Sequence, residues 1–154
     1  MSAGSFVIPD KARLNFFNAT DLLGANPANF KLALVTSSYT PAQGTDEVWA
    51  DVSANEISAA GGYSAGGAAM TGVALTQTSG VVKFTSSPVV FTAAGGSIVA
   101  WRRAVIYYNG TLNGKVNPLV AHFLGDATPA DVSATAAPNT ITITMPTAGI
   151  VSVS

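Results

Sequence analysis

The chain has 154 residues, a formal net charge of −1 and no cysteine, so disulfides and thiolate metal sites are excluded. A net charge this small provides no long-range field that would hold a polyanion such as DNA. Charged residues make up 10% of the chain, against about 25% in ordinary soluble domains, which favours either a surface that partner proteins cover or an extracellular β protein coated with Ser and Thr.

The N-terminal residues predict an arm followed by a helix. Residues 1–8 have no hydrophobic periodicity, but they end in a consecutive apolar run at residues 6–8. Pro9 suits the first turn of a helix, and the apolar spacing predicts one short amphipathic helix that ends between Asn18 and Gly24. The first residues lack the basic stretch and the following apolar core of a signal peptide, so we expect no signal peptide. No window of about 18 to 20 residues is apolar throughout, so we expect no membrane-spanning helix.

From residue 30 onward the pattern predicts strands. Residues 30–35 alternate between large apolar side chains and smaller or charged ones, which predicts a first strand. Residues 46–51 are expected to form a helical turn that carries Trp49, and the Gly-rich residues 59–67 are expected to form a loop. Further strands are predicted over Val73–Thr76, Val81–Thr85, Val89–Thr92, Ile98–Tyr108, Leu119–Leu124, Thr140–Met145 and Ile150–Val153.

Two Asn-Gly pairs predict hairpin turns. Both central residues of a type I′ turn need positive φ, which suits Asn109-Gly110 and Asn113-Gly114. Six to eight short strands after one helix predict a mainly β fold, a β-sandwich or jelly-roll-like domain. We expect one such domain over residues 9–154, preceded by an N-terminal arm at residues 1–8.

One pattern matches the nucleophile elbow of serine hydrolases. The stretch Gly62-Tyr63-Ser64-Ala65-Gly66 has the form G-x-S-x-G, in which a strand-to-helix turn exposes the Ser. The one histidine is His122, and no Asp or Glu lies between Ser64 and His122, so the order Ser, acid, His of these hydrolases is not met. A flexible Gly-rich turn is the favoured interpretation, and no catalytic residue is predicted.

The sequence predicts no metal or cofactor site. The acidic residues that cluster in sequence are Asp46, Glu47, Asp51 and Glu56. Their spacing fits neither an EF-hand loop nor a His-carboxylate site, and a solvated face is the expected role. His122 alternates with apolar residues in a predicted strand, where a half-buried, hydrogen-bonded imidazole is expected. The glycines at residues 61–67 lack the Lys and Ser/Thr of a phosphate-binding loop.

Two arginines stand side by side in a predicted strand. Successive side chains of a strand point to opposite faces, so Arg102 and Arg103 diverge, and one of them must lie toward the core. A buried guanidinium needs a carboxylate or carbonyl partner, so we expect an internal pair for one arginine. The other, taken as Arg102, is a candidate contact to an acidic neighbouring subunit.

Several short segments carry a resemblance to a known group of proteins. They are residues 30–37 (FKLALVTS), Glu56-Ile57, Gly62-Tyr63 with Gly66-Gly67, residues 103–107 (RAVIY) and Pro118-Leu119. Together, over about residues 14–125, they resemble small structural proteins of tailed bacteriophages. The resemblance implies a β-sandwich subunit of the virion, assembled in the host cytoplasm and without enzymatic activity. Residues 139–154 depart from the pattern.

The primary hypothesis is a capsid decoration (cement) protein. Such a subunit is expected to bind the shell of the major capsid protein as a homo-oligomer, in the favoured interpretation a trimer, without nucleic acid, membrane or cofactor. Its candidate contact residues are Phe6, Val7, Ile8 and Arg102. Three consecutive apolar residues exceed what a hydrophobic staple on the chain's own helix needs, so the arm is expected to order on a neighbouring subunit.

Other functions stay open from the sequence. Within the virion, the alternative is a tail, connector or fibre component. Outside that class, a carbohydrate-binding module would present exposed aromatic side chains such as Trp49 and Tyr39 around a groove. A serine esterase acting through Ser64 is the remaining, disfavoured hypothesis.

Overall fold

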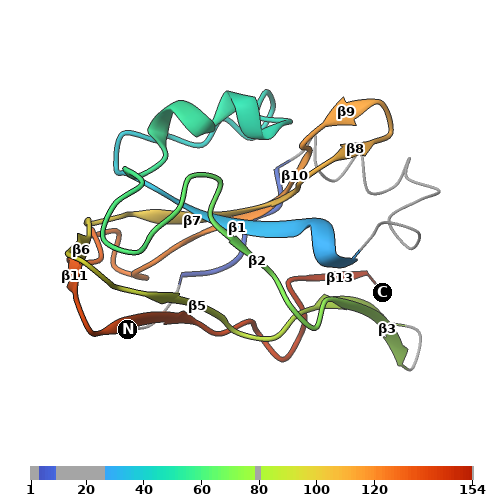
Figure 1. Cartoon of the computed structure of the whole chain (residues 1–154). Helices are drawn as coiled ribbons and strands as arrows, with labels where there is room; N and C mark the ends of the chain where they lie inside the picture. The colour runs from blue at the N-terminus through green and yellow to red at the C-terminus, as the bar shows by residue number, and fades with distance from the viewer. Residues whose placement is uncertain (1–3, 10–26, 79–80, 154) are drawn as a thin grey trace.

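The computed structural model describes residues 4–9, 27–78 and 81–153. These residues form two layers of antiparallel sheet, with loops and short turns on the outside of one layer (Figure 1). The prediction of a mainly β fold is confirmed, and the arrangement is consistent with the predicted β-sandwich. The helix predicted between Pro9 and Gly24 falls on residues 10–26, which lie outside the described residues.

The first layer is a four-stranded antiparallel sheet in the order β10-β7-β1-β2. Its strands are β1 (Phe30–Val35), β2 (Ala68–Ala69), β7 (Arg103–Tyr108) and β10 (Leu119–Leu124), and a 3-10 turn, η1 (Pro27–Asn29), leads into β1. In β1, Phe30, Leu32 and Leu34 face the second layer, whereas Ala33 and Val35 face the outside of the sheet. Both faces are buried, which explains why these strands are almost continuously apolar in sequence.

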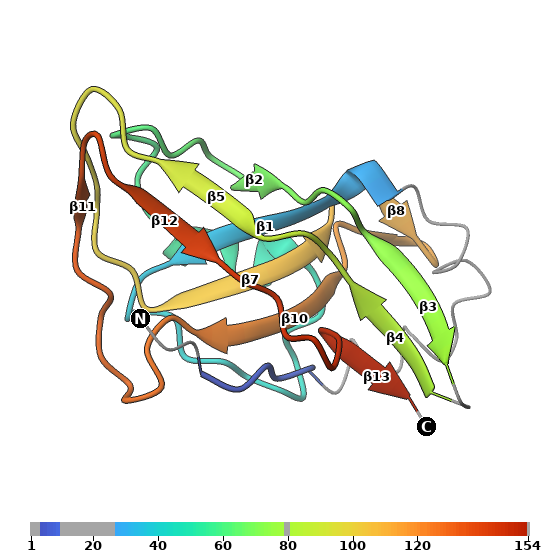
Figure 2. The ribbon, with the colours of Figure 1, turned by 90° about the horizontal axis from the view of Figure 1, so that it is seen from below.

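The second layer consists of two neighbouring antiparallel groups, β12-β5 and β13-β4-β3. Its strands are β3 (Ala74–Thr78), β4 (Val81–Thr85), β5 (Val89–Thr92), β12 (Thr140–Ile143) and β13 (Val151–Val153). Seen from below, β4 leads into β5 and β12 leads into β13, so the two groups follow one another along the layer (Figure 2). In β12, Ile141 and Ile143 point inward while Thr140 and Thr142 are exposed, as a half-buried strand requires.

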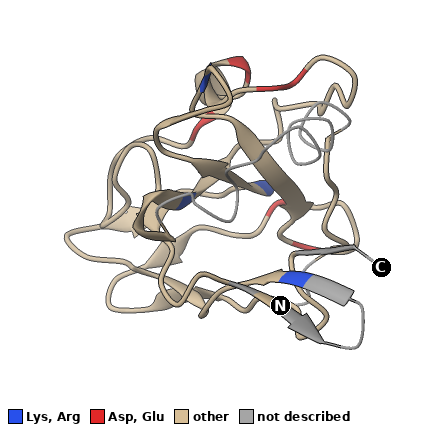
Figure 3. Ribbon diagram, turned by 90° about the vertical axis from the view of Figure 1, so that its right-hand side faces the viewer, with Lys and Arg blue, Asp and Glu red and all other residues tan. Residues whose placement is uncertain are grey.

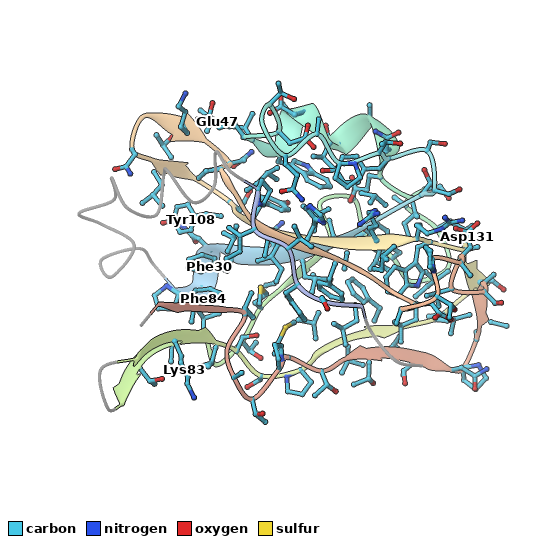
Figure 4. The ribbon with its side chains drawn as sticks, turned by 180° about the vertical axis from the view of Figure 1, so that it is seen from behind. Phe30, Glu47, Lys83, Phe84, Tyr108 and Asp131 are labelled. Carbon is cyan, nitrogen blue, oxygen red and sulfur yellow. The ribbon has the colours of Figure 1, made fainter. Side chains whose placement is uncertain are left out.

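Aromatic rings from both layers meet between the sheets. The ring centroid of Phe30 lies 4.9 Å from that of Phe84 and 5.2 Å from that of Tyr108 (Figure 4). A second pair, Tyr63 and Phe91, has centroids 5.5 Å apart. All five side chains are buried. Because truncating a buried Phe to Ala costs about 3 to 5 kcal/mol, these contacts are a major part of what holds the layers together.

Residues 36–57, which we call the cover, lie on the outer face of the first layer (Figure 1). They include two 3-10 turns, η2 (Trp49–Asp51) and η3 (Ser53–Asn55). The ring of Trp49 stacks on that of Tyr107 at a centroid distance of 4.8 Å and an interplanar angle of 7°. The carboxylate of Asp51 accepts hydrogen bonds from the two amides before Trp49, at 2.9 and 3.0 Å, which fixes the start of η2. The helical turn predicted at residues 46–51 is confirmed in its second half, as a 3-10 turn.

The single strand predicted over residues 98–108 is interrupted. β6 (Ser97–Ile98) pairs with β11 (Thr135–Ala136), which is followed by a turn into the second layer, whereas β7 begins at Arg103 in the first layer. Between them, Trp101 forms an isolated bridge with Val132. The chain therefore changes layer over residues 99–102, although its β propensity runs through without a break.

The two Asn-Gly pairs have different roles. β8 (Thr111–Leu112) and β9 (Lys115–Val116) form a small hairpin whose turn has φ of 51° at Asn113 and 72° at Gly114, as predicted. The same prediction is wrong for Asn109-Gly110, since Gly110 is not among the residues with positive φ. The Gly110 amide instead donates to the side chain of Asn117 at 2.9 Å, because the hairpin formed by β7 and β10 continues into β8 and β9 rather than closing at this point.

Candidate interaction surfaces

The N-terminal arm, residues 4–9 of the described chain, lies antiparallel to the edge of β10. The Gly4 amide donates to the Leu124 carbonyl at 2.8 Å. The Val7 amide donates to the His122 carbonyl at 2.8 Å, and the His122 amide donates to the Val7 carbonyl at 2.9 Å. The arm thus adds a short extra strand to the first layer, on the side of β10 away from β7.

The apolar residues of the arm pack on the same domain. The ring of Phe6 stacks on that of Phe123, with centroids 4.2 Å apart. Phe6, Val7 and Ile8 are half-buried and Pro9 is buried. The expectation that this run orders on a neighbouring subunit rested on its being exposed in a monomer, and the structure corrects that premise. The chain's own β10 supplies both the main-chain hydrogen bonds and the apolar contact.

The two arginines have different surroundings, and the internal ion pair belongs to the one that was expected to contact a neighbour. Arg102, the candidate for contact with a neighbouring subunit, pairs with Asp131 of its own chain, with Nε 2.7 Å from Oδ1, at the rim of the fold (Figure 4). Arg103 lies on the outer face of β7, half-buried, and burial lowers the pKa of its guanidinium. No ion pair of Arg103 is found in the described part of the chain. The internal pair therefore belongs to Arg102.

Each of the four clustered acidic residues has a partner within the chain. Asp46 accepts a hydrogen bond from Tyr39, Asp51 from two amides, Glu56 from Tyr63, and Glu47 from Lys115. Burial, and then the bond to Asp46, raise the pKa of Tyr39 well above its usual value. Over residues 4–9, 27–78 and 81–153, no three acidic or histidine side chains are grouped to hold a metal ion. The sequence predicts a solvated face for these acidic residues. In the structure they instead make hydrogen bonds that stabilise the cover.

Ser64 and His122 are not brought together. Ser64 is exposed in a turn, whereas His122 is 2% exposed on the outer face of β10. Neither ring nitrogen of His122 has a hydrogen-bond partner among the described residues. The imidazole therefore does not accept a proton from Ser64 in this arrangement, and the sequence expectation of a hydrogen-bonded His122 is wrong as well.

A hydrogen-bond network ties the Gly-rich loop to the first layer. The hydroxyl of Tyr63 accepts from the Leu34 amide at 3.0 Å and donates to Glu56 at 2.8 Å. The same carboxylate oxygen of Glu56 accepts from the Gly66 amide at 2.6 Å, and the Tyr107 hydroxyl donates to the Gly66 carbonyl at 2.8 Å. Burial raises the pKa of Tyr107 to about 12, so this hydroxyl stays a donor at any physiological pH. These bonds hold residues 61–67 in place without any catalytic group.

The second layer is almost free of charge. From Ala68 to Ala100 the sequence contains one charged residue, Lys83, and from Val132 to Ser154 it contains none. Lys83 and Glu47 of the cover lie at opposite edges of the molecule (Figure 4). Acidic residues gather in the cover (Figure 3). The sequence does not predict this separation of charge, because it does not show which strands share a layer.

The outer side of β5 and β12 carries no charged side chain, and we call it the Thr/Val face. Its exposed side chains are Val90, Thr92, Thr140 and Thr142. Thr140 lies opposite Thr92, and Thr142 opposite Val90, whose side chain is 50% exposed. The hydroxyl-bearing side of residues 140–144 was anticipated from the sequence, but its pairing with β5 was not.

Comparisons with family models, with curated proteins and with solved structures found no match to this chain. Within the described residues, no helix has the length and apolar character needed to span a membrane.

Proposed function

We propose that this protein is a non-enzymatic structural subunit of a tailed-bacteriophage virion, and specifically a decoration subunit on the capsid shell. The observation that carries the proposal is the Thr/Val face, which belongs to a layer with a single charged residue, Lys83. The centre of a protein–protein interface is depleted of charged residues, because each buried charge must be desolvated or paired. A layer from which charge is almost absent suits contact with another protein surface.

The geometry of the Thr/Val face supports docking against a broad surface. Two antiparallel strands hold its side chains in fixed alternation, so little order has to be gained on binding. Thr side chains lose little conformational freedom, and their hydroxyls donate and accept hydrogen bonds across an interface. Val90, which is 50% exposed, adds apolar area to this face.

The phage assignment rests on the resemblance, and one feature of the fold supports it. Residues from three separate segments of the resembling pattern, Glu56, Tyr63 with Gly66, and Tyr107, form the single hydrogen-bond network that attaches the Gly-rich loop to the sheet. A pattern whose members interact is expected of residues that maintain a common fold. The network shows that these segments have a structural role in this chain, and the assignment to a shell is part of the proposal.

The carbohydrate-binding alternative loses its main support. Tyr39 and Trp49, which belong to the cover, are 5% and 9% exposed, and Trp101 is 1% exposed. Neither tryptophan therefore lines an open groove. No specific observation favours a tail or fibre component over a shell component, and the experiment below distinguishes the two positions.

The test is charge insertion on the Thr/Val face. The double variant Val90→Glu, Thr142→Glu should stay folded and lose no more than about 1 kcal/mol of stability, because both positions are exposed although the two carboxylates lie directly opposite each other. Its binding to particles that lack the protein should fall at least tenfold, since two unpaired carboxylates would be buried in the contact. Co-sedimentation measures binding, and electron microscopy of the reconstituted particles locates the wild type.

The matched control is Ser37→Glu, Ser38→Glu, which adds the same charge at exposed positions of the cover. Equal binding by the face variant and wild type would refute the docking surface. Wild-type protein located at the tail would replace the shell assignment by the alternative, and no binding to any part of the particle would overturn the proposal.

A further inference from the structure

A group of polar side chains is enclosed between the cover and the first layer. His122 projects from β10 onto the same outer face as Arg103 of β7, and Tyr39 and Asp46 approach it from the cover. The rings of Tyr39 and His122 meet edge to face, with centroids 6.3 Å apart at 88°. His122 is 2% exposed, and both its ring nitrogens lack a hydrogen-bond partner in the described structure.

This surrounding favours the neutral imidazole. The carboxylate of Asp46 is already used, since it accepts the Tyr39 hydroxyl at 2.7 Å and the Ala42 amide at 2.8 Å. Burial, and then the positive charge of Arg103, lower the pKa of His122 to about 4, against a smaller opposing effect of Asp46. From the described arm, the facing residue is the uncharged Val7. A proton on His122 would therefore place a second cation beside Arg103 without a partner.

The same residue holds the N-terminal arm. Both hydrogen bonds between Val7 and β10 are made by the backbone of His122, and another bond of the described arm joins Gly4 to Leu124. The arm is an edge segment of six described residues, so it opens at a lower free energy than the whole fold. Val7 lies directly opposite His122 in an antiparallel bridge, so its side chain is the neighbour of the imidazole on the outer face at this edge. Opening the arm removes that neighbour and lets water reach the imidazole from the edge of β10, which provides solvation for a protonated ring.

We propose that His122 is an acid-sensitive latch, whose protonation detaches residues 4–9 from the edge of β10. At neutral pH the imidazole is uncharged, and the arm stays paired. In acid, the open state takes up a proton that the closed state excludes, so the equilibrium moves toward the open arm and exposes Phe6 and the β10 edge. The inference goes beyond the proposed function and does not depend on it, because it concerns the free subunit.

The sign and size of the effect follow from proton linkage. The pKa of the closed state is depressed, to about 4, below the ordinary histidine value near 6.5. The closed state is therefore unaffected above pH 6.5, and it loses a factor of about ten in population relative to the open state for each pH unit between 6.5 and 4. At pH 5 the open arm should be favoured up to about 20-fold more than at pH 7, the upper limit being an open-state imidazole with the ordinary pKa.

The experiment uses the full chain in solution. Because His122 is the one histidine of the sequence, its imidazole proton resonances are unambiguous in an NMR titration. Hydrogen exchange of the Val7 and His122 amides reports the arm directly. The wild type and His122→Leu are compared at the same pH, so that the intrinsic pH dependence of exchange cancels. At pH 5 the wild-type amides should be up to about 20-fold less protected than those of His122→Leu, after both are normalised at pH 7.

Two further variants separate the charges around the latch. Arg103→Met removes the neighbouring cation, so it should raise the pKa of His122 in the closed state. The pH range over which acid opens the arm should then become narrower. Asp46→Asn removes the other group that titrates in acid, and acid sensitivity should persist in it. An imidazole that titrates near 6.5 in the folded wild type overturns the proposal. So does equal acid loss of arm protection in wild type and His122→Leu. If His122→Leu does not fold, the wild-type titration and Arg103→Met decide in its place.

Discussion

At the scale of single residues, the chain uses buried hydroxyls and carboxylates as fixed connections. Glu56, Tyr63 and Tyr107 are separated by up to 51 positions, yet one network joins them to the Gly-rich loop. The sequence could not reveal this. A Tyr in a Gly-rich stretch has no local pattern that identifies its partner, and G-x-S-x-G drew attention to Ser64, which is exposed. The informative residue of that motif is Tyr63, its neighbour.

The network predicts a graded loss of stability. Tyr63→Phe leaves the Leu34 amide and the Glu56 carboxylate each without one partner, so it should cost about 2 to 3 kcal/mol in the free energy of unfolding. Tyr107→Phe removes a single bond to the Gly66 carbonyl and should cost about 1 kcal/mol. Urea denaturation of both variants measures the difference. Equal losses would mean that the Tyr63 hydroxyl does not hold two partners at once.

A second residue-scale prediction concerns backbone conformation alone. Gly114 has φ of 72°, and a Cβ at this position would meet no atom within 4 Å. Gly114→Ala should therefore cost about 1 kcal/mol through positive φ rather than through crowding. Gly110→Ala should lose stability through crowding instead, because its Cβ would lie 2.9 Å from the ring of Tyr108. Thermal unfolding of Gly114→Ala, with Thr111→Ala in the same hairpin as a control, checks the first; a Gly114→Ala variant as stable as wild type contradicts it.

At the scale of elements, sequence periodicity located strands well and their partners badly. β1, β4, β5 and β10 have the predicted bounds, because each is a short β-branched or apolar run between turn residues. The sequence predicts one strand over residues 98–108, since nothing local marks the change of layer near Trp101. Likewise, nothing local shows that β10 of the same chain pairs with the arm. Strand pairing is a long-range property, and residues 6–8 carry apolar character without indicating which edge they cover.

Pairing of the arm in its own chain has a measurable consequence. Phe6→Ala removes the ring that stacks on Phe123 at 4.2 Å, and should lower stability by about 1 to 2 kcal/mol, less than a fully buried Phe because Phe6 is half-buried. Ser5→Ala, at an exposed position of the same arm, should be neutral. The free energies of unfolding in urea at pH 7 test both. A Phe6→Ala variant with wild-type stability would contradict packing of the arm on its own chain and would favour contact of the arm with a neighbouring molecule.

At the scale of the whole molecule, one side carries many charged residues and the other side carries almost none. The cover carries four of the acidic residues, whereas the strands of the second layer carry Lys83 alone. The low charged fraction was visible in the composition, but its confinement to one layer depends on topology. The edge of β12 adds to this asymmetry, because its residues 140–143 contain no charge or proline that would discourage pairing with another strand.

A layer of this kind predicts self-association of the free protein when no partner covers it. Sedimentation velocity should show a mass that rises with concentration, since an uncharged face and an unprotected strand edge have no repulsive element. Val90→Lys with Thr142→Lys should keep the protein monomeric, by placing two cations on the Thr/Val face. Ser37→Lys with Ser38→Lys adds the same charge on the cover and should leave association unchanged. Suppression by both pairs would assign the effect to net charge instead of to the face, and a concentration-independent wild-type monomer would contradict the prediction outright.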